Sequence, residues 1–228
     1  APGAAEAEAP APASAAAPAL TEELRPVAAS VFGEALPLAE RYVGHLATTG
    51  TEWGLLGPRE VPRLWERHVL NCAVIEDAFS RDARVIDVGS GAGLPGLAVA
   101  IARPDLDVHL VEPMLRRTEW LEHTTRELDL DNVTVHRGRA EEFHGQLSAP
   151  FVTARAVARL DKLARWCVPL VDPGGQMIAM KGRSAADEIA TAAKVLRRLG
   201  VTASEVTPHG ADILDEPTLT VDCSVRGG

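Results

Sequence analysis

The sequence predicts an α/β fold with a mostly parallel, Rossmann-like sheet of seven strands, the last of them antiparallel, behind an N-terminal helical extension. Short β-branched runs alternate with helical stretches from about residue 81 to residue 200, which is typical of parallel strands joined by crossover helices. The first of these runs leads directly into a glycine-rich turn. Two further β-branched runs close the chain without a helix between them, which favours an antiparallel pair.

Length and composition agree with one core that needs neither a disulfide nor a metal. The chain has 228 residues, 46% of them hydrophobic, and carries a net charge of −9. Its three cysteines, Cys72, Cys167 and Cys223, lie far apart, which indicates a reducing, cytoplasmic compartment and no zinc site. No apolar run approaches the roughly 18 residues that span a bilayer, and the first residues do not resemble a signal peptide. We therefore expect neither secretion nor membrane insertion.

The N-terminal part divides into a tail and a helical extension. Residues 1–19 contain eleven Ala and four Pro, a composition that predicts a disordered tail. Residues 20–80 form the predicted helical extension. Apolar positions recur at helical spacing from Thr21 to about Ala47, interrupted near Pro37, which predicts two short helices. The same periodicity predicts one amphipathic helix between Glu60 and Phe79.

Residues 81–228 form the predicted sheet domain. Its helices are expected near residues 95–102, 114–129, 159–170 and 184–199. The last helix carries end signals, because Ser184 and Asp187 resemble a capping box and Gly200 suits a C-terminus. The expected strands are Arg84–Val88, Asp107–Glu112, Val133–Arg137, Phe151–Ala154, Gln176–Met180, Thr202–Thr207 and Leu219–Val225.

The glycine turn that follows the first strand is the strongest chemical signal. Gly91-x-Gly93-x-x-Gly96 satisfies the dinucleotide fingerprint, which would place a pyrophosphate here. The alternative pattern is Asp87-x-Gly89-x-Gly91-x-Gly93, which resembles the first motif of S-adenosylmethionine-dependent methyltransferases. A carboxylate at Asp87 would face the cofactor's ammonium group favourably, directly or through water, whereas it would repel a pyrophosphate.

Glu112 ends the second strand and supports adenosine binding in either class of enzyme. A carboxylate at this position accepts hydrogen bonds from both ribose hydroxyls. Chain length favours the methyltransferase, because a dehydrogenase normally adds a separate catalytic domain and this chain has one sheet and a helical preface. A small-molecule methyltransferase, an NAD(P)-linked oxidoreductase and a non-catalytic RNA- or cofactor-binding module remain as alternatives.

The motifs together resemble one family. Ile86-Asp-Val-Gly-Ser-Gly-Ala-Gly-Leu-Pro-Gly96, preceded by Trp65-Glu-Arg-His68 and followed by Arg155-Ala156 and Lys181-Gly182, is similar to the RsmG (glucose-inhibited division protein B) family. The resemblance covers about residues 36 to 200. It implies S-adenosylmethionine-dependent methylation of guanine N7 in 16S rRNA, at position 527 in rRNA numbering, within a small ribosomal subunit or an assembly intermediate. It also implies a cytoplasmic enzyme, which we expect to be a monomer without a metal.

The resemblance also implies roles for individual residues. One departure is Asn71-Cys72, where many members of the family carry Asp-Ser. The adenine amino group is expected to reach Glu141 or the backbone beside it. Cofactor contacts are expected at Asp87, Gly89, Gly91, Gly93, Leu94, Glu112, Ala140, Glu141 and Arg155. RNA contacts are expected at Arg67, His68, Lys181 and Arg183, and the candidates for positioning the reacting groups are His68, Arg155 and Lys181.

The chemistry of guanine N7 agrees with this set of residues. N7 carries a lone pair and no proton in neutral guanine, so no general base is required, and the sequence contains no arrangement that demands one. The net charge of −9 is unevenly distributed along the chain. Residues 153–198 hold nine Lys+Arg and four Asp+Glu, a net +5, which leaves −14 for the remainder. We expect this basic segment to lie near the crevice and to contact RNA.

Overall fold

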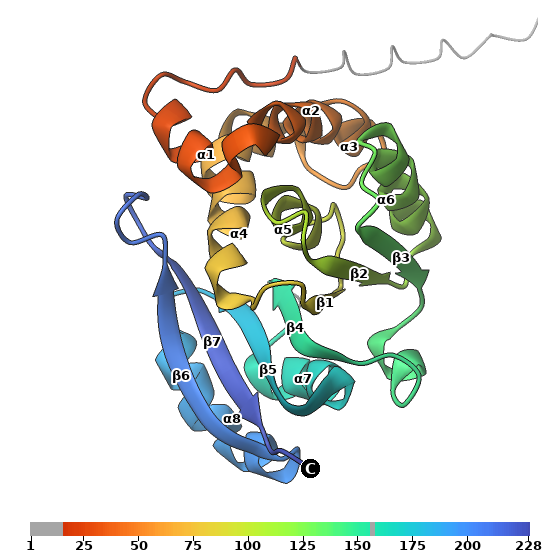
Figure 1. The fold of residues 1–228 in the computed structure, drawn as a ribbon, viewed down its shortest axis with the longest axis vertical. Coiled ribbons are helices and arrows are strands. Elements are labelled where there is room, and N and C mark those ends of the chain that lie inside the picture. The colour runs from red at the N-terminus through yellow and green to blue at the C-terminus, as the bar shows by residue number, and fades with distance from the viewer. Residues whose placement is uncertain (1–15, 156–157) are drawn as a thin grey trace, which may run out of the picture.

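The computed structural model describes residues 16–155 and 158–228 (Figure 1). Residues 1–15 of the predicted tail, and Ala156 of the Arg155-Ala156 motif, lie outside the described residues. Residues 16–19 belong to no helix, although the Pro18 carbonyl accepts a hydrogen bond from the indole N–H of Trp65 at 3.2 Å. The described end of the tail therefore rests on the helical extension.

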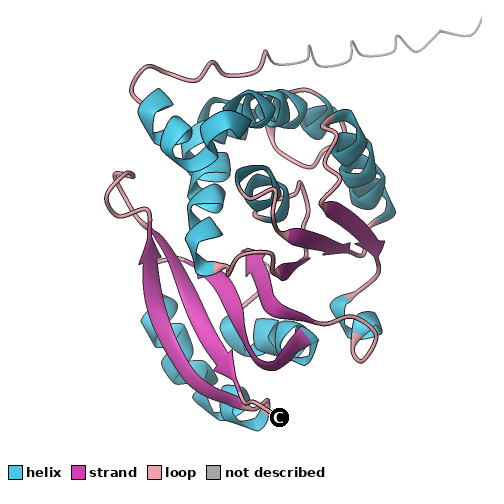
Figure 2. Cartoon of the chain, viewed as in Figure 1, coloured by secondary structure: helices cyan, strands magenta, loops and turns pink. Residues whose placement is uncertain are grey.

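The seven predicted strands form a single sheet (Figure 2), in which their order is β3-β2-β1-β4-β5-β7-β6. Strand β7 is antiparallel to both of its neighbours, and the other pairings are parallel. All seven predicted strands are present, with β4, β5 and β6 longer than predicted. The strands are β1 (Arg84–Val88), β2 (Asp107–Glu112), β3 (Val133–Arg137), β4 (Ala149–Arg155), β5 (Val171–Lys181), β6 (Val201–His209) and β7 (Thr218–Val225).

Alternate strand residues point to opposite sides of the sheet, so each face presents apolar side chains, and helices cover both faces. On β1, Val85 belongs to the core shared with the N-terminal helices, α5 (Gly96–Ala102) and α6 (Leu115–Glu127). The next residue, Ile86, belongs to the core shared with α7 (Leu160–Cys167) and α8 (Ala185–Arg198). Short 3-10 turns, η5 (Ala140–Phe143) and η6 (Val168–Leu170), complete the connections.

The helical extension departs from the prediction in detail. Helix α1 (Arg25–Phe32) ends at Gly33, whose φ of 51° suits glycine, so the break precedes Pro37. Pro37 lies in the first turn of α2, where a missing N–H costs nothing. The amphipathic helix predicted over residues 60–79 is helical, but its hydrogen bonding changes along its length. The elements that follow α1 are η1 (Gly33–Ala35), α2 (Leu36–Ala47), α3 (Thr49–Glu52), η2 (Pro58–Arg63), the π turn η3 (Leu64–Leu70), α4 (Asn71–Ala73) and η4 (Val74–Ala78).

The capping box predicted for α8 is wrong. Ser184 occupies the N-cap position, but its side chain makes no capping hydrogen bond to the backbone. Its hydroxyl instead donates to Glu188 at 3.3 Å. Glu188 lies one residue beyond Asp187 and already accepts hydrogen bonds from other partners, so the side-chain pairing moves by one position.

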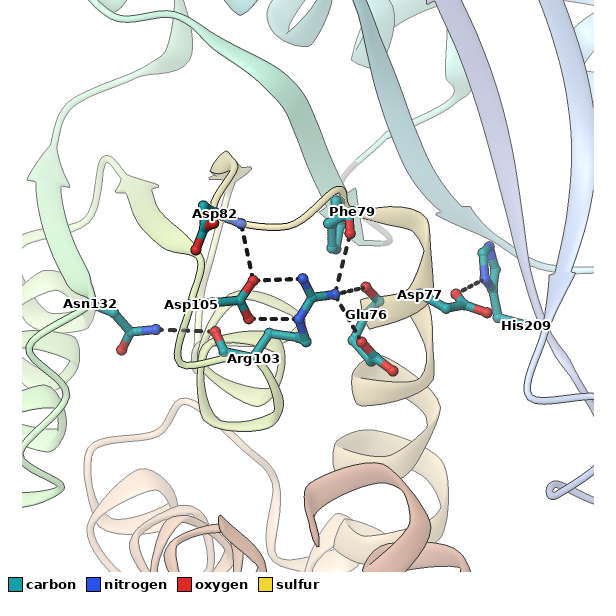
Figure 3. A network of polar contacts seen from close by, with 8 residues as sticks. All are labelled: Glu76, Asp77, Phe79, Asp82, Arg103, Asp105, Asn132 and His209. Carbon is teal, nitrogen blue, oxygen red and sulfur yellow. Dashed lines mark hydrogen bonds and ion pairs between the residues drawn. The ribbon is translucent and has the colours of Figure 1, made fainter. Parts of the chain in front are cut away.

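Arg103 fastens the extension to the sheet (Figure 3). Its guanidinium donates two parallel bonds of 2.7 Å to Asp105 and further bonds to the carbonyls of Glu76 and Phe79. The carboxylate of Asp77 lies 2.6 Å from Nδ1 of the buried His209, which ties the end of η4 to β6. The extension and the sheet also share one hydrophobic core. In the described part of the chain, no helix combines the length and apolar character that a membrane crossing requires.

Candidate functional site

The predicted cofactor residues converge at the carboxyl edge of the sheet. Gly89 follows β1, Glu112 ends β2, Ala140 follows β3 and Arg155 ends β4. These four strands are neighbours in the order β3-β2-β1-β4, so the residues line one continuous edge. Ligands of open α/β sheets bind at this edge, beside the strand where the order reverses.

The glycine turn uses backbone conformations that side chains disfavour. Gly89, Gly91 and Gly93 have φ angles of 74°, 56° and 81°. A Cβ on Gly93 would lie 2.4 Å from a methyl carbon of Leu97, whereas a Cβ on Gly91 would meet only the Gly89 carbonyl oxygen, at 3.9 Å. Gly93 is thus required for packing, and Gly91 leaves open space where a ligand can approach the backbone.

Asp87 lies beneath this turn and is fully buried. One carboxylate oxygen accepts a hydrogen bond from the Gly96 amide at 2.9 Å, and the other has no partner among the described residues. Burial raises the pKa of Asp87 to about 7. A Cβ on Gly96 would come within 2.6 Å of the bonded oxygen, so the glycine permits this contact. The carboxylate holds the first turn of α5 and is not exposed for direct contact with a cofactor.

Glu112 is buried and oriented by two backbone amides. Its oxygens accept hydrogen bonds of 3.0 Å from Gly91 and from Met114, and the guanidinium of Arg117 lies 3.8 Å away. Each carboxylate oxygen keeps a further lone pair for a ligand hydroxyl. Met114 and Leu115, which follow directly, are 53% and 47% exposed. This apolar surface beside Glu112 suits an adenine ring, and its position two and three residues after the acid is the sequence signal that the motif analysis missed.

The adenine side of the edge continues at β3. Ala140 is buried and Glu141 is exposed in the turn η5. A cavity of about 400 Å³ lies next to them, lined by Pro113, Arg137, Gly138, Arg139 and Glu142. The predicted contacts at Ala140 and Glu141 are therefore within the same region as Glu112.

Tyr42 is a site residue that sequence reasoning missed. It is fully buried on α2, and its hydroxyl donates to the carbonyls of Ala92 and Gly93 at 2.7 and 3.1 Å. Burial raises its pKa well above the usual value, so the hydroxyl keeps its proton. The only available sequence signal is that Tyr42 is the single tyrosine of the chain. The extension thus supports the glycine turn directly.

Arg155 is held by a chain of polar contacts from the extension. One guanidinium nitrogen lies 2.8 Å from Nδ1 of His68, and another lies 3.3 Å from the sulfur of the buried Cys72. Nε2 of His68 lies 2.7 Å from the carboxylate of Glu60. Burial lowers the pKa of His68, although Glu60 opposes the shift. A neutral His68 that donates to Glu60 and accepts from Arg155 satisfies both contacts. His68 therefore orients Arg155, while its neighbour Arg67 is exposed.

Lys181 is used inside the protein. Its side chain is 6% exposed, and its ammonium donates to the Ala158 carbonyl at 2.6 Å and pairs with Glu188 at 2.9 Å. Glu188 also accepts a hydrogen bond from the Leu160 amide at 2.8 Å. Lys181 and Glu188 therefore bind the backbone of Ala158 and Leu160, which follow β4. A contact between Lys181 and RNA would require these bonds to break, whereas Arg183 is 88% exposed.

The basic segment 153–198 does not gather at the crevice as expected. Helix α8 begins at the carboxyl edge after β5 and runs back to the start of β6, which is parallel to β5. Its last turn therefore carries Arg197 and Arg198 to the opposite edge. Arg155, Lys181 and Arg183 remain at the site, where they line a cavity of about 440 Å³. Among the described residues, no group of three or more His, Cys, Asp and Glu side chains is placed to hold a metal ion.

Comparisons with known proteins identify a family and close relatives. Residues 35–214 match the family model described as rRNA small subunit methyltransferase G. The chain is 56% identical over 203 residues to the protein of that name from Renibacterium salmoninarum, covering 89% of this chain and 94% of the relative. It is 50% identical over 208 residues to the protein of that name from Thermobifida fusca, covering 90% and 88% of the two chains.

Solved structures share the fold at low sequence identity. An O-methyltransferase family protein from Burkholderia thailandensis aligns with a TM-score of 0.54 and 16% identity, covering 90% of this chain and 70% of that chain. TYW2 from M. jannaschii, in complex with AdoMet, aligns with a TM-score of 0.54 and 14% identity, covering 71% and 77%. Both share the fold of this chain.

Proposed function

The chain belongs to the rRNA small subunit methyltransferase G family, and on this premise we propose that it methylates N7 of guanine 527 in 16S rRNA with S-adenosylmethionine. The substrate form that we propose is a small ribosomal subunit or an assembly intermediate, in the cytoplasm, with the enzyme acting as a monomer. Residues 20–80 act as the helical extension and residues 81–228 as the methyltransferase domain.

The observation that carries the proposal is the meeting of the glycine turn with the carboxylate of Glu112. The Gly91 amide donates to Glu112 at 3.0 Å, so the glycine turn and the carboxylate proposed to bind the ribose form one surface. The second oxygen of Asp87 is buried and has no partner in the described chain, so the ionised form of this side chain adds negative potential beneath the turn, which favours the cationic cofactor. The residues that would contact it are Gly89, Gly91, Gly93, Leu94, Glu112, Ala140, Glu141 and Arg155, with Asp87 acting from beneath the turn.

The same contacts argue against the dinucleotide alternative. A pyrophosphate requires free amides at the start of the helix after the glycine turn. Here the Gly96 amide already donates to Asp87, and the buried carboxylate would repel a second anion. The turn therefore suits a zwitterionic ligand better than NAD(P).

Bound S-adenosylmethionine supplies an electrophilic methyl group on a sulfonium centre. The acceptor N7 attacks with an existing lone pair, so no side chain has to remove a proton. The task of the protein is to align the acceptor with the methyl group and to exclude competing orientations. Arg155 lies where the glycine turn meets the cavity of about 440 Å³, and His68 and Cys72 fix its guanidinium there. We assign to Arg155 the positioning of the cofactor against the acceptor base.

The test combines labelled cofactor with small ribosomal subunits that lack the modification. Strand scission at N7-methylguanine should map one site, at the proposed guanine. Glu112→Gln should weaken binding of S-adenosylhomocysteine at least tenfold, while Glu119→Gln, the same change on the exposed face of α6, should not. Labelling elsewhere in the rRNA, or of free small molecules alone, would contradict the proposal.

A thermal shift measurement separates the cofactor classes. S-adenosylhomocysteine at a hundred times its dissociation constant should stabilise the fold by about 2.7 kcal/mol, and NADH should not. Methylation of subunits but not of naked rRNA would identify the assembled particle as the substrate.

A further inference from the structure

The loop between β6 and β7 brings one carboxylate to the cavity of about 440 Å³ that Arg155, Lys181 and Arg183 also line, here called the acceptor cavity. Glu216 lines this cavity together with Asn71, Arg155 and Lys181. Its position is fixed two residues later, where the buried Thr218 donates to the Asn71 carbonyl at 2.8 Å. The loop that carries Glu216 is therefore anchored to the extension and to the sheet.

Glu216 is the carboxylate of this cavity that a ligand can reach. Glu188, the other acid in the lining, is occupied by Lys181, by the Leu160 amide and by Ser184. Glu216 contacts Arg183 at 2.7 Å, but the two side chains are 78% and 88% exposed. An exposed pair of this kind contributes about 0–1 kcal/mol, so a ligand can replace it at little cost.

A carboxylate at the wall selects the chemistry of the ligand. It repels a phosphate, so the group that contacts Glu216 must present hydrogen-bond donors, which on a nucleobase are N–H groups. Guanine presents two adjacent donors, N1–H and the 2-amino group, which match the two oxygens of a carboxylate. Adenine has an acceptor at N1, and cytosine and uracil each lack a second adjacent donor. Two parallel bonds to a charged acceptor therefore fit guanine alone among the four bases.

Resting on the proposed function, we infer that Glu216 determines specificity for the acceptor by binding N1–H and the 2-amino group of the target guanine. N7 lies on the other side of the purine ring from these donors. A base held at Glu216 consequently leaves N7 directed away from the carboxylate and free to accept the methyl group, while Arg155 lines the same cavity. Reading of a splayed-out base through this edge is a common mode of RNA recognition.

The test compares Glu216→Gln with Asp215→Asn, which makes the same charge change in the same loop on an exposed residue outside the cavity lining. Each protein is given small subunits reconstituted with guanine or with inosine at the target, since inosine lacks the 2-amino group. The wild-type protein should prefer guanine about ten- to a hundredfold in kcat/KM, as expected for one hydrogen bond to a charged group. Glu216→Gln should lose about as much on guanine, and its preference over inosine should fall towards one.

Three results would overturn the inference. Equal activity of Glu216→Gln and Asp215→Asn would remove Glu216 from recognition. A loss that is the same for guanine and inosine would assign Glu216 to loop structure. Absence of methylation by the wild-type protein would refute the proposed function as well. If the wild-type protein does methylate the guanine, a negative result with Glu216→Gln refutes only the role of Glu216. Binding of S-adenosylhomocysteine, measured for each variant, should stay within twofold of wild type, since Glu216 lies outside the glycine turn.

Discussion

Tyr42→Phe tests whether the helical extension shapes the cofactor turn. The substitution removes one hydroxyl and keeps the ring, so the packing of a fully buried side chain is preserved. The Gly93 carbonyl keeps a second donor, the Leu97 amide at 2.7 Å. No other donor reaches the Ala92 carbonyl in the described part of the chain, so one buried acceptor loses its partner. That loss costs about 1–3 kcal/mol of unfolding free energy.

Thr124→Val is the matched control. It also removes one hydroxyl from a fully buried side chain, but the Thr124 hydroxyl has no partner among the described residues. We expect Tyr42→Phe to lower the unfolding free energy by about 2 kcal/mol and Thr124→Val to leave it unchanged or raise it, both measured by urea denaturation. Titration calorimetry should show S-adenosylhomocysteine binding about tenfold weaker in Tyr42→Phe, or ~1.4 kcal/mol. Equal stability of the two variants, or unchanged binding, would refute the role assigned to Tyr42.

Three further substitutions test other contacts. Burial raises the Asp87 pKa from 3.8 to about 7, so between these pH values the native state binds a proton that the unfolded state has lost, and stability falls as pH rises. The unfolding free energy, measured by urea titration at pH 5 and at pH 8, should therefore differ less in Asp87→Asn than in wild type. An equal difference would contradict the assignment. Arg103→Leu should lower the unfolding free energy by about 2–3 kcal/mol, because several hydrogen bonds are lost at a largely buried guanidinium. Arg84→Leu, which removes a half-exposed ion pair, should cost less than about 1 kcal/mol. Equal losses would show that the Arg103 network adds nothing to stability. His68→Ala should reduce kcat/KM for subunits about tenfold by releasing Arg155, and full activity would exclude the positioning role.

The sheet was predictable because its signals are local. Most parallel strands are short β-branched runs, such as residues 84–88 and 107–112, and these two are followed by the helices α5 and α6. The hydrogen bonding within residues 58–78 was not predictable. Apolar spacing indicates a helix, but it does not distinguish α turns from the 3-10 and π turns found there.

In the site too, features with a local sequence signal were predictable and contacts between distant segments were not. The glycine turn and Glu112 sit in motifs whose spacing specifies a backbone geometry. The partners of Lys181 could not be read from the sequence, since Glu188 and Ala158 approach it from separate elements. Charge counting failed for a related reason. A run of residues crosses the molecule along α8, so neighbours in sequence reach opposite edges of the sheet.

The extension contributes to both halves of the site, and this changes how its motif should be interpreted. Tyr42 supports the cofactor turn, while His68 and Cys72 hold Arg155. Asn71 lines the acceptor cavity and anchors the loop that carries Glu216 through Thr218. Trp65-Glu-Arg-His68 precedes the sheet in sequence, yet its histidine acts on a residue at the end of β4. A motif on an appended segment can therefore serve alignment within the site, whereas contact between the exposed Arg67 and RNA stays a prediction.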